Sequence, residues 1–100
     1  MDMIKVETEA FSGVAVAMYE LPFPDVLLAM TTEGGAQLMR MTKLLKLAVV
    51  PGQVAELEAL SFQEYSAVLE SWASLSVRAG SGEKDLLVEA DWLIDEIEQG

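Results

Sequence analysis

The spacing of hydrophobic residues is most regular between residues 61 and 80, where apolar side chains recur every three or four positions. This spacing places them on one face of an α-helix. Ser61 and Glu64 match a capping box, and Gly80 is a natural C-terminal stop. The sequence therefore predicts an amphipathic helix from Ser61 to about Arg78, with its aromatic stripe in the core of the protein rather than against a partner. The apolar face comprises Phe62, Tyr65, Val68, Leu69, Trp72, Leu75 and Ala79.

Two prolines break the chain before this region. Pro22 and Pro24 fix their own backbone angles and disfavour helix in the residue before each. Asp25 follows them and has the side chain of an N-cap, so residues 26–32 predict a short helix. The glycine pair at 34–35 is expected to end that helix.

A longer helix is predicted over residues 36–50, where apolar side chains again share one face. That face comprises Leu38, Met41, Leu45 and Ala48, with Leu44 beside them. The same segment carries half of the positive charge of the chain, as a basic stripe formed by Arg40, Lys43 and Lys46. The Pro-Gly dipeptide that follows is expected to stop the helix, and residues 53–60 predict one or two further helical turns.

The two ends of the chain have different patterns. Residues 4–10 alternate apolar and polar side chains as a half-buried strand does, and 14–21 would return as a second strand after a turn at 12–13. A hairpin over residues 1–20 would need to pack on the helices, because a lone hairpin is marginal in water; a loose N-terminal arm is the alternative. Residues 83–98, with seven acids and one base, predict an acidic C-terminal helix.

Length and composition set the fold class. One hundred residues normally form one domain with one modest core, and a hydrophobic content of 52% is too high for a disordered chain. We therefore predict a single, mainly α-helical domain over residues 1–100, a small bundle of about four to five helices. The N-terminal hairpin would make this domain α+β.

The charge of the chain narrows the choice of partners. A net charge of −11 disfavours nucleic acid, whose binding depends on cations that neutralise phosphates, and it disfavours an anionic membrane surface. The most apolar stretches are also far shorter than the ~20 residues of a membrane span. No cysteine is present and no signal peptide is visible, which favours a cytosolic setting. The charge itself is expected to keep an apolar chain in solution.

The sequence contains no pattern typical of catalysis. Histidine is absent, and acid pairs such as Glu56 with Glu58 are expected to point apart on an exposed helix and stay solvated. No calcium-binding loop and no glycine-rich phosphate motif is present. We therefore expect a non-enzymatic protein with no cofactor and no metal. The basic stripe is a weak phosphate site; pairing with the acidic C-terminal helix, within the chain or in a neighbouring copy, is the favoured alternative.

Apolar residues outside the predicted helix faces are the candidate contacts with another protein. Trp92 lies off the apolar face of its own predicted helix, on the same side as Val88, and either contacts a partner or packs under the N-terminal segment. On the helix over 36–50, Met39 and Leu47 lie outside the apolar face. The predicted partner-binding residues are therefore Val88, Trp92, Met39 and Leu47. This surplus of apolar helix surface favours a protein partner or self-association.

One succession of features extends over about 60 residues of the chain. It consists of a short helix, a Leu-rich helix, a Leu-Ser pair, a helix ending in a Trp, and then a Ser and a Gly-Glu pair. Here the fixed points are Leu60, Ser61, Trp72, Ser76, Gly82 and Glu83. In this succession the chain resembles tail assembly chaperones of long-tailed bacteriophages, most closely the small ones from phages of actinobacteria.

The resemblance implies a small, acidic, mostly helical protein of the host cytoplasm. It implies that the protein coats the tape measure protein, keeps it soluble and helps the tail tube polymerise around it, and that its gene often also yields a longer, frameshifted form. Two other functions stay open at this point. One is a structural connector that self-assembles into rings and remains in the virion. The other is a small acidic regulatory adaptor, such as a mimic of nucleic acid.

Overall fold

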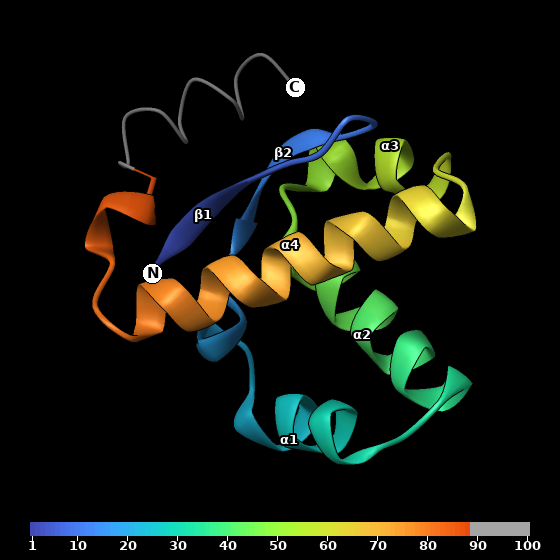
Figure 1. Ribbon diagram of the computed structural model, residues 1–100, viewed down its shortest axis with the longest axis horizontal. Helices are drawn as coiled ribbons and strands as arrows, with labels where there is room; N and C mark the ends of the chain where they lie inside the picture. The colour runs from blue at the N-terminus through green and yellow to red at the C-terminus, as the bar shows by residue number, and fades with distance from the viewer. Residues whose placement is uncertain (89–100) are drawn as a thin grey trace.

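The computed structural model describes residues 1–88, and it has the α+β form of the predicted bundle (Figure 1). Two strands, β1 (Met3–Glu7) and β2 (Ser12–Val16), form an antiparallel hairpin at the N-terminus. The helices that follow are α1 (Phe23–Thr31), α2 (Gly35–Ala48), α3 (Val54–Glu58) and α4 (Phe62–Gly80), with short 3-10 turns η1 (Met18–Glu20), η2 (Pro51–Gln53) and η3 (Lys84–Leu86) between or after them.

Helix α4 crosses the middle of the molecule, with the hairpin on one side of it and α1 on the other (Figure 1). The predicted capping box is confirmed at its start. The Ser61 hydroxyl accepts a hydrogen bond from the Glu64 N–H at 3.2 Å, and the Glu64 carboxylate accepts one from the Ser61 N–H at 2.9 Å. These two bonds satisfy free N–H groups of the first turn and fix where α4 begins.

Two side chains of α4 tie this helix to the chain just after the hairpin. Trp72 is fully buried, and its indole N–H donates a hydrogen bond to the Val16 carbonyl at 2.9 Å. One turn further along, the buried Ser76 hydroxyl accepts a hydrogen bond from the Met18 N–H at 2.9 Å. The hydrogen bonds keep polar groups satisfied inside an otherwise apolar core.

We expect Ser76→Ala to lower the free energy of unfolding by about 1–3 kcal/mol, because the buried N–H of Met18 would lose its acceptor. Urea denaturation followed by circular dichroism measures this change. Ser74→Ala is the matched control, since Ser74 lies exposed on the same helix, and it should change stability by less than about 0.5 kcal/mol. Equal effects of the two substitutions would contradict this account of the core.

Each outer edge of the hairpin pairs with one further residue of the chain through an isolated β-bridge. Ile4 lies opposite Ala15 in the hairpin register. Leu87 bridges to Ile4 on the outer edge of β1, and Val49 bridges to Ala15 on the outer edge of β2. These four residues form one continuous row across the sheet, which gives the two-stranded hairpin the additional partners that it needs in water.

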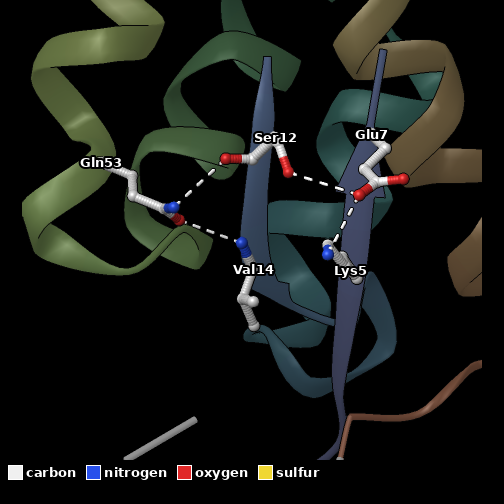
Figure 2. A network of polar contacts seen from close by, with 5 residues as sticks. All are labelled: Lys5, Glu7, Ser12, Val14 and Gln53. Atoms are coloured by element: carbon white, nitrogen blue, oxygen red, sulfur yellow. Dashed lines mark hydrogen bonds and ion pairs between the residues drawn. The ribbon is translucent and has the colours of Figure 1, made fainter. Parts of the chain in front are cut away.

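Gln53 completes the outer edge of β2 through its side chain (Figure 2). Its Oε1 atom accepts a hydrogen bond from the Val14 N–H at 3.0 Å, and its Nε2 atom donates one to the Ser12 carbonyl at 3.3 Å. The side-chain amide thus takes the place of a backbone peptide group in a neighbouring strand. Gly13 makes this approach possible, since a Cβ atom there would lie 2.6 Å from Gln53 Oε1 and 2.6 Å from Phe11 Cζ.

One face of the hairpin carries Lys5 and Glu7 of β1, which form an ion pair at 3.0 Å (Figure 2). The Ser12 hydroxyl of β2 lies 3.5 Å from the Glu7 carboxylate. These groups are exposed, so they contribute little to stability. The apolar part of this face is a small cluster of Met3, Val14 and Val50, against which Val88 packs.

We expect Gly13→Ala to destabilise the protein by about 1–3 kcal/mol, because the added methyl group would displace Gln53 or Phe11. Thermal unfolding measures the effect. Gly35→Ala is the control: a Cβ there meets nothing within 4 Å, and alanine is favoured over glycine in a helix by up to about 1 kcal/mol. A Gly13→Ala protein as stable as the Gly35→Ala protein would refute the close contact described above.

Some predicted boundaries near the N-terminus are wrong. The hairpin turns at residues 8–11, where the Thr8 N–H donates to the Phe11 carbonyl at 2.8 Å, and the expected turn at 12–13 belongs to β2. Helix α1 begins at Phe23, before Asp25, because Pro24 falls in the first turn, where its missing N–H has no partner to lose. Gly34, with φ of 68°, precedes α2 as its N-cap and does not end α1.

The predicted acidic helix over residues 83–98 does not form over its first residues. Residues Lys84–Leu86 make a single 3-10 turn, and the Val88 N–H then donates to the Met3 carbonyl at 2.8 Å. The free edge of β1 offers these residues a hydrogen-bonding partner that sequence periodicity does not reveal. The remainder of this prediction, including Trp92, lies outside the described residues.

Candidate binding groove

An apolar groove of about 500 Å³ lies between α2 and α4 and is closed at one side by α1. Leu38 and Met41 of α2 form one wall, and Leu69 and Val77 of α4 form the other. Among the described residues that line it, Glu70 alone is charged. The groove is open to solvent, since side chains that line it are largely exposed: Phe62 at 72%, Met30 at 62% and Val77 at 63%.

A second hollow, of about 510 Å³, continues the groove toward the C-terminal end of α4. The two hollows share Met18, Met30 and Val77, so they adjoin. Together they follow α4 from Phe62 to Gly80, a rise of about 27 Å at 1.5 Å per residue. The combined surface, which we call the α4 groove, has the length of a helix of about five turns.

Helix α1 adds a second apolar surface beside the α4 groove. Its inner side packs Ala29 into the core, yet Phe23, Leu27 and Met30 at positions i, i+4 and i+7 form an exposed stripe on another side. Met30 belongs both to this stripe and to the groove. The stripe and the groove are therefore continuous, and large apolar side chains are exposed along both.

Methionine contributes heavily to the lining of the groove. Met18, Met30 and Met41, three of the six methionines of the chain, line it. Their unbranched, polarisable side chains adapt to partners of different shape. Such side chains let the surface adjust to apolar groups of different shape.

The pKa values of Tyr19 and Tyr65, near the α4 groove, are both raised. The Tyr19 hydroxyl donates a hydrogen bond to the Asp2 carboxylate at 2.6 Å, and this bond, with some desolvation, raises the pKa of Tyr19 to about 12. Burial raises the pKa of Tyr65, and the carboxylate of Glu58 adds to the shift. A phenol with its ordinary pKa of about 10 is already neutral at physiological pH, so the raised pKa values leave the charge of both tyrosines unchanged there.

Of the four residues predicted from the sequence, the structure describes three, and Val88 lies at a different place from Met39 and Leu47. Met39 and Leu47 are exposed, at 64% and 73%, but they lie on the side of α2 that faces away from the α4 groove. Val88 is partly buried against the cluster of Met3, Val14 and Val50. Trp92 lies outside the described residues.

The aromatic stripe of α4 is divided between the core and the groove. Trp72 and Leu69 are buried as predicted, but the prediction that Phe62 belongs to the core is wrong, because 72% of its surface is exposed. The hairpin and α2 cover the middle of α4 and leave its first turn open. The sequence pattern did not indicate that Met30 and Val77 line an exposed groove. The excess of apolar residues in the short helix α1 was the one signal of an exposed surface there.

Comparisons of the chain with protein-family models, with curated proteins and with solved structures find no match. Within residues 1–88, no group of three or more acidic, His or Cys side chains is placed to hold a metal ion. No helix in the described part of the chain combines the length and apolarity required to cross a membrane.

We expect Phe62→Ala to leave the free energy of unfolding within about 0.5 kcal/mol of the wild type, and to weaken the fluorescence of the apolar dye 1-anilinonaphthalene-8-sulfonate bound to the folded protein. Leu69→Ala, on the same stripe but only 6% exposed, should instead cost about 2–5 kcal/mol. Urea unfolding and dye titration measure the two effects. A large loss of stability in Phe62→Ala would mean that Phe62 belongs to the core.

Proposed function

We propose that this protein is a non-enzymatic tail assembly chaperone of a long-tailed bacteriophage, which binds helices of the tape measure protein in the host cytoplasm. The observation that carries the proposal is the α4 groove with the adjoining stripe on α1. The resemblance of residues 24–83 to tail assembly chaperones supplies the identity of the client.

The dimensions of the surface favour a helical client. The α4 groove is long enough for about five helical turns. Its described lining is mostly apolar, with Gln37, Ser66 and Ser76 as polar residues and Glu70 and Lys84 as charged ones. An amphipathic helix that lays its apolar side into a groove makes contacts at intervals of three and four residues. The tape measure protein is a very long helical protein, so it offers many such segments to successive chaperone molecules.

A chaperone must also keep its complex with the client in solution, and the charge of the chain supports this. A complex in which apolar helices are coated stays in solution only if the outer surface repels its neighbours. With 17 acids against 6 bases, the chain supplies this repulsion. Apolar binding surface and excess negative charge are thus complementary parts of the same proposed activity.

Co-expression with the tape measure protein encoded beside this chain tests the proposal, and α1 offers a matched pair of variants. Leu27 and Leu28 are neighbours with almost equal exposure, 46% and 47%, but only Leu27 shares the stripe of Phe23 and Met30. We expect Leu27→Asp to weaken client binding roughly tenfold or more, because a charge would enter an apolar interface. Leu28→Asp should leave binding unchanged. The measurements are the soluble fraction of the client and its affinity in a pull-down titration.

Three results would overturn the proposal. A tape measure protein that is equally soluble with and without this chain would refute the chaperone function. Equal effects of the two leucine variants would refute the location of the client site. Stoichiometric amounts of the protein in purified virions would favour a structural connector, because a chaperone is expected to leave before the virion is complete.

A further inference from the structure

Glu70 lies in the middle of the apolar lining of the α4 groove. Four residues of α4 line the groove at positions i, i+4, i+7 and i+11, which form one stripe along a helix: Ser66, Glu70, Ala73 and Val77. A helix that docks along α4 between Phe62 and Val77 must therefore pass over Glu70. This residue is exposed, so a partner in the groove can reach it.

The carboxylate of Glu70 has no partner among residues 1–88. It forms no ion pair and no hydrogen bond with any of them. The other acid of α4, Glu64, is held in the capping box by the Ser61 N–H. Lys84, which lines the second hollow, donates a hydrogen bond to the Ala79 carbonyl at 3.2 Å. Of the two charged groups that line the groove, Glu70 is therefore the one that the described residues leave without a partner.

A wholly apolar helix would bind unfavourably at this point of the groove. Such a helix would remove the Glu70 carboxylate from water, and a charge that is buried without a partner costs far more than a paired one. Among the described residues, no base lines the hollow that contains Glu70, so the protein does not itself supply a counter-charge there. The counter-charge must therefore come from the client.

An arginine of the client suits this position better than a lysine. Its guanidinium group is planar, is more weakly hydrated than an ammonium group, and can donate two parallel hydrogen bonds to a carboxylate. The Ser66 hydroxyl, one turn before Glu70 in the same lining, offers an acceptor to the remaining N–H groups. The apolar stem of an arginine side chain can also pack along the wall of the groove.

We propose that Glu70 determines which client helices the α4 groove accepts, by selecting those with an arginine at the centre of an otherwise apolar face. This inference rests on the proposed function, because it concerns the client of the same groove. Glu70 lies about two helical turns from Phe62 and about three from Gly80. The client segment should therefore carry apolar residues at intervals of three and four for about two turns on each side of the arginine.

Synthetic peptides test this selection on the full-length protein. Three peptides of about 18 residues, the length of five helical turns, share one amphipathic sequence and differ only at the central position of the apolar face, which is Arg, Met or Glu. We expect the wild type to bind the Arg peptide about tenfold more tightly than the Glu peptide, with the Met peptide between them. Isothermal titration calorimetry measures the affinities. Shifts in the amide signals of residues 62–77 of a 15N-labelled sample show that the peptides occupy the groove.

Matched variants separate the effect of Glu70 from that of the negative charge of the whole chain. Glu70→Gln should weaken binding of the Arg peptide about fivefold or more, and Glu70→Arg should reverse the preference, so that the Glu peptide binds best. Glu56→Gln changes the net charge by the same amount as Glu70→Gln, at an exposed position of α3 outside the groove lining, and should leave all three affinities unchanged. Circular dichroism compares the folded state of the variants with that of the wild type.

Two results would overturn the selection by Glu70 and leave the groove as a client site, since the peptides would still bind. One is an unchanged order of the three affinities in Glu70→Arg. The other is an equal loss of affinity for the Arg peptide in Glu70→Gln and Glu56→Gln, because the attraction would then come from the net charge. Failure of all three peptides to bind would contradict the client site itself, and this inference with it.

Discussion

The burial of Trp72 under the hairpin is the interaction on which the rest of the structure depends. This side chain is the largest fully buried group in the described part of the chain, and its indole N–H is satisfied by the Val16 carbonyl at 2.9 Å. A large aromatic side chain contributes both its apolar area and a geometric requirement, because its N–H needs a partner inside the core. The requirement fixes where the end of β2 lies along α4, and Ser76 fixes η1 one turn further on.

One side of α4 therefore packs against the hairpin, and only its other side remains for contacts with α1 and α2. The core is completed by Ile4, Val6, Leu45 and Leu57, all nearly or fully buried. Helices α1 and α2 cover α4 only in part, and the apolar side chains that remain uncovered line the α4 groove. A chain of this length cannot enclose all of its apolar helix surface, so the groove is a consequence of small size combined with high hydrophobicity.

The two sides of α2 differ in composition and in what they contact. Its inner side supplies Leu44 and Leu45 to the core and Leu38 and Met41 to the groove, and its outer side carries bases and exposed apolar residues. A helix can present different surfaces in this way because successive side chains are rotated by about 100°. The proposed client site therefore uses only side chains of the inner side of α2.

The sequence by itself determined that α2 and α4 are helices, where α4 begins and that α2 ends before Pro51. The capping box at Ser61, the break at Pro51 and the periodicity of α2 and α4 are local signals, and local hydrogen bonding and helical spacing are sufficient to read them. The tertiary structure alone decided which apolar residues are buried. Phe62 and Trp72 lie on the same predicted face, yet one is exposed and the other is not, because burial depends on which distant segment covers each turn of the helix. The same reason explains why residues 87–88 pair with β1 in place of continuing a helix: their partner is more than seventy residues away in the sequence, and only the folded chain brings the two together.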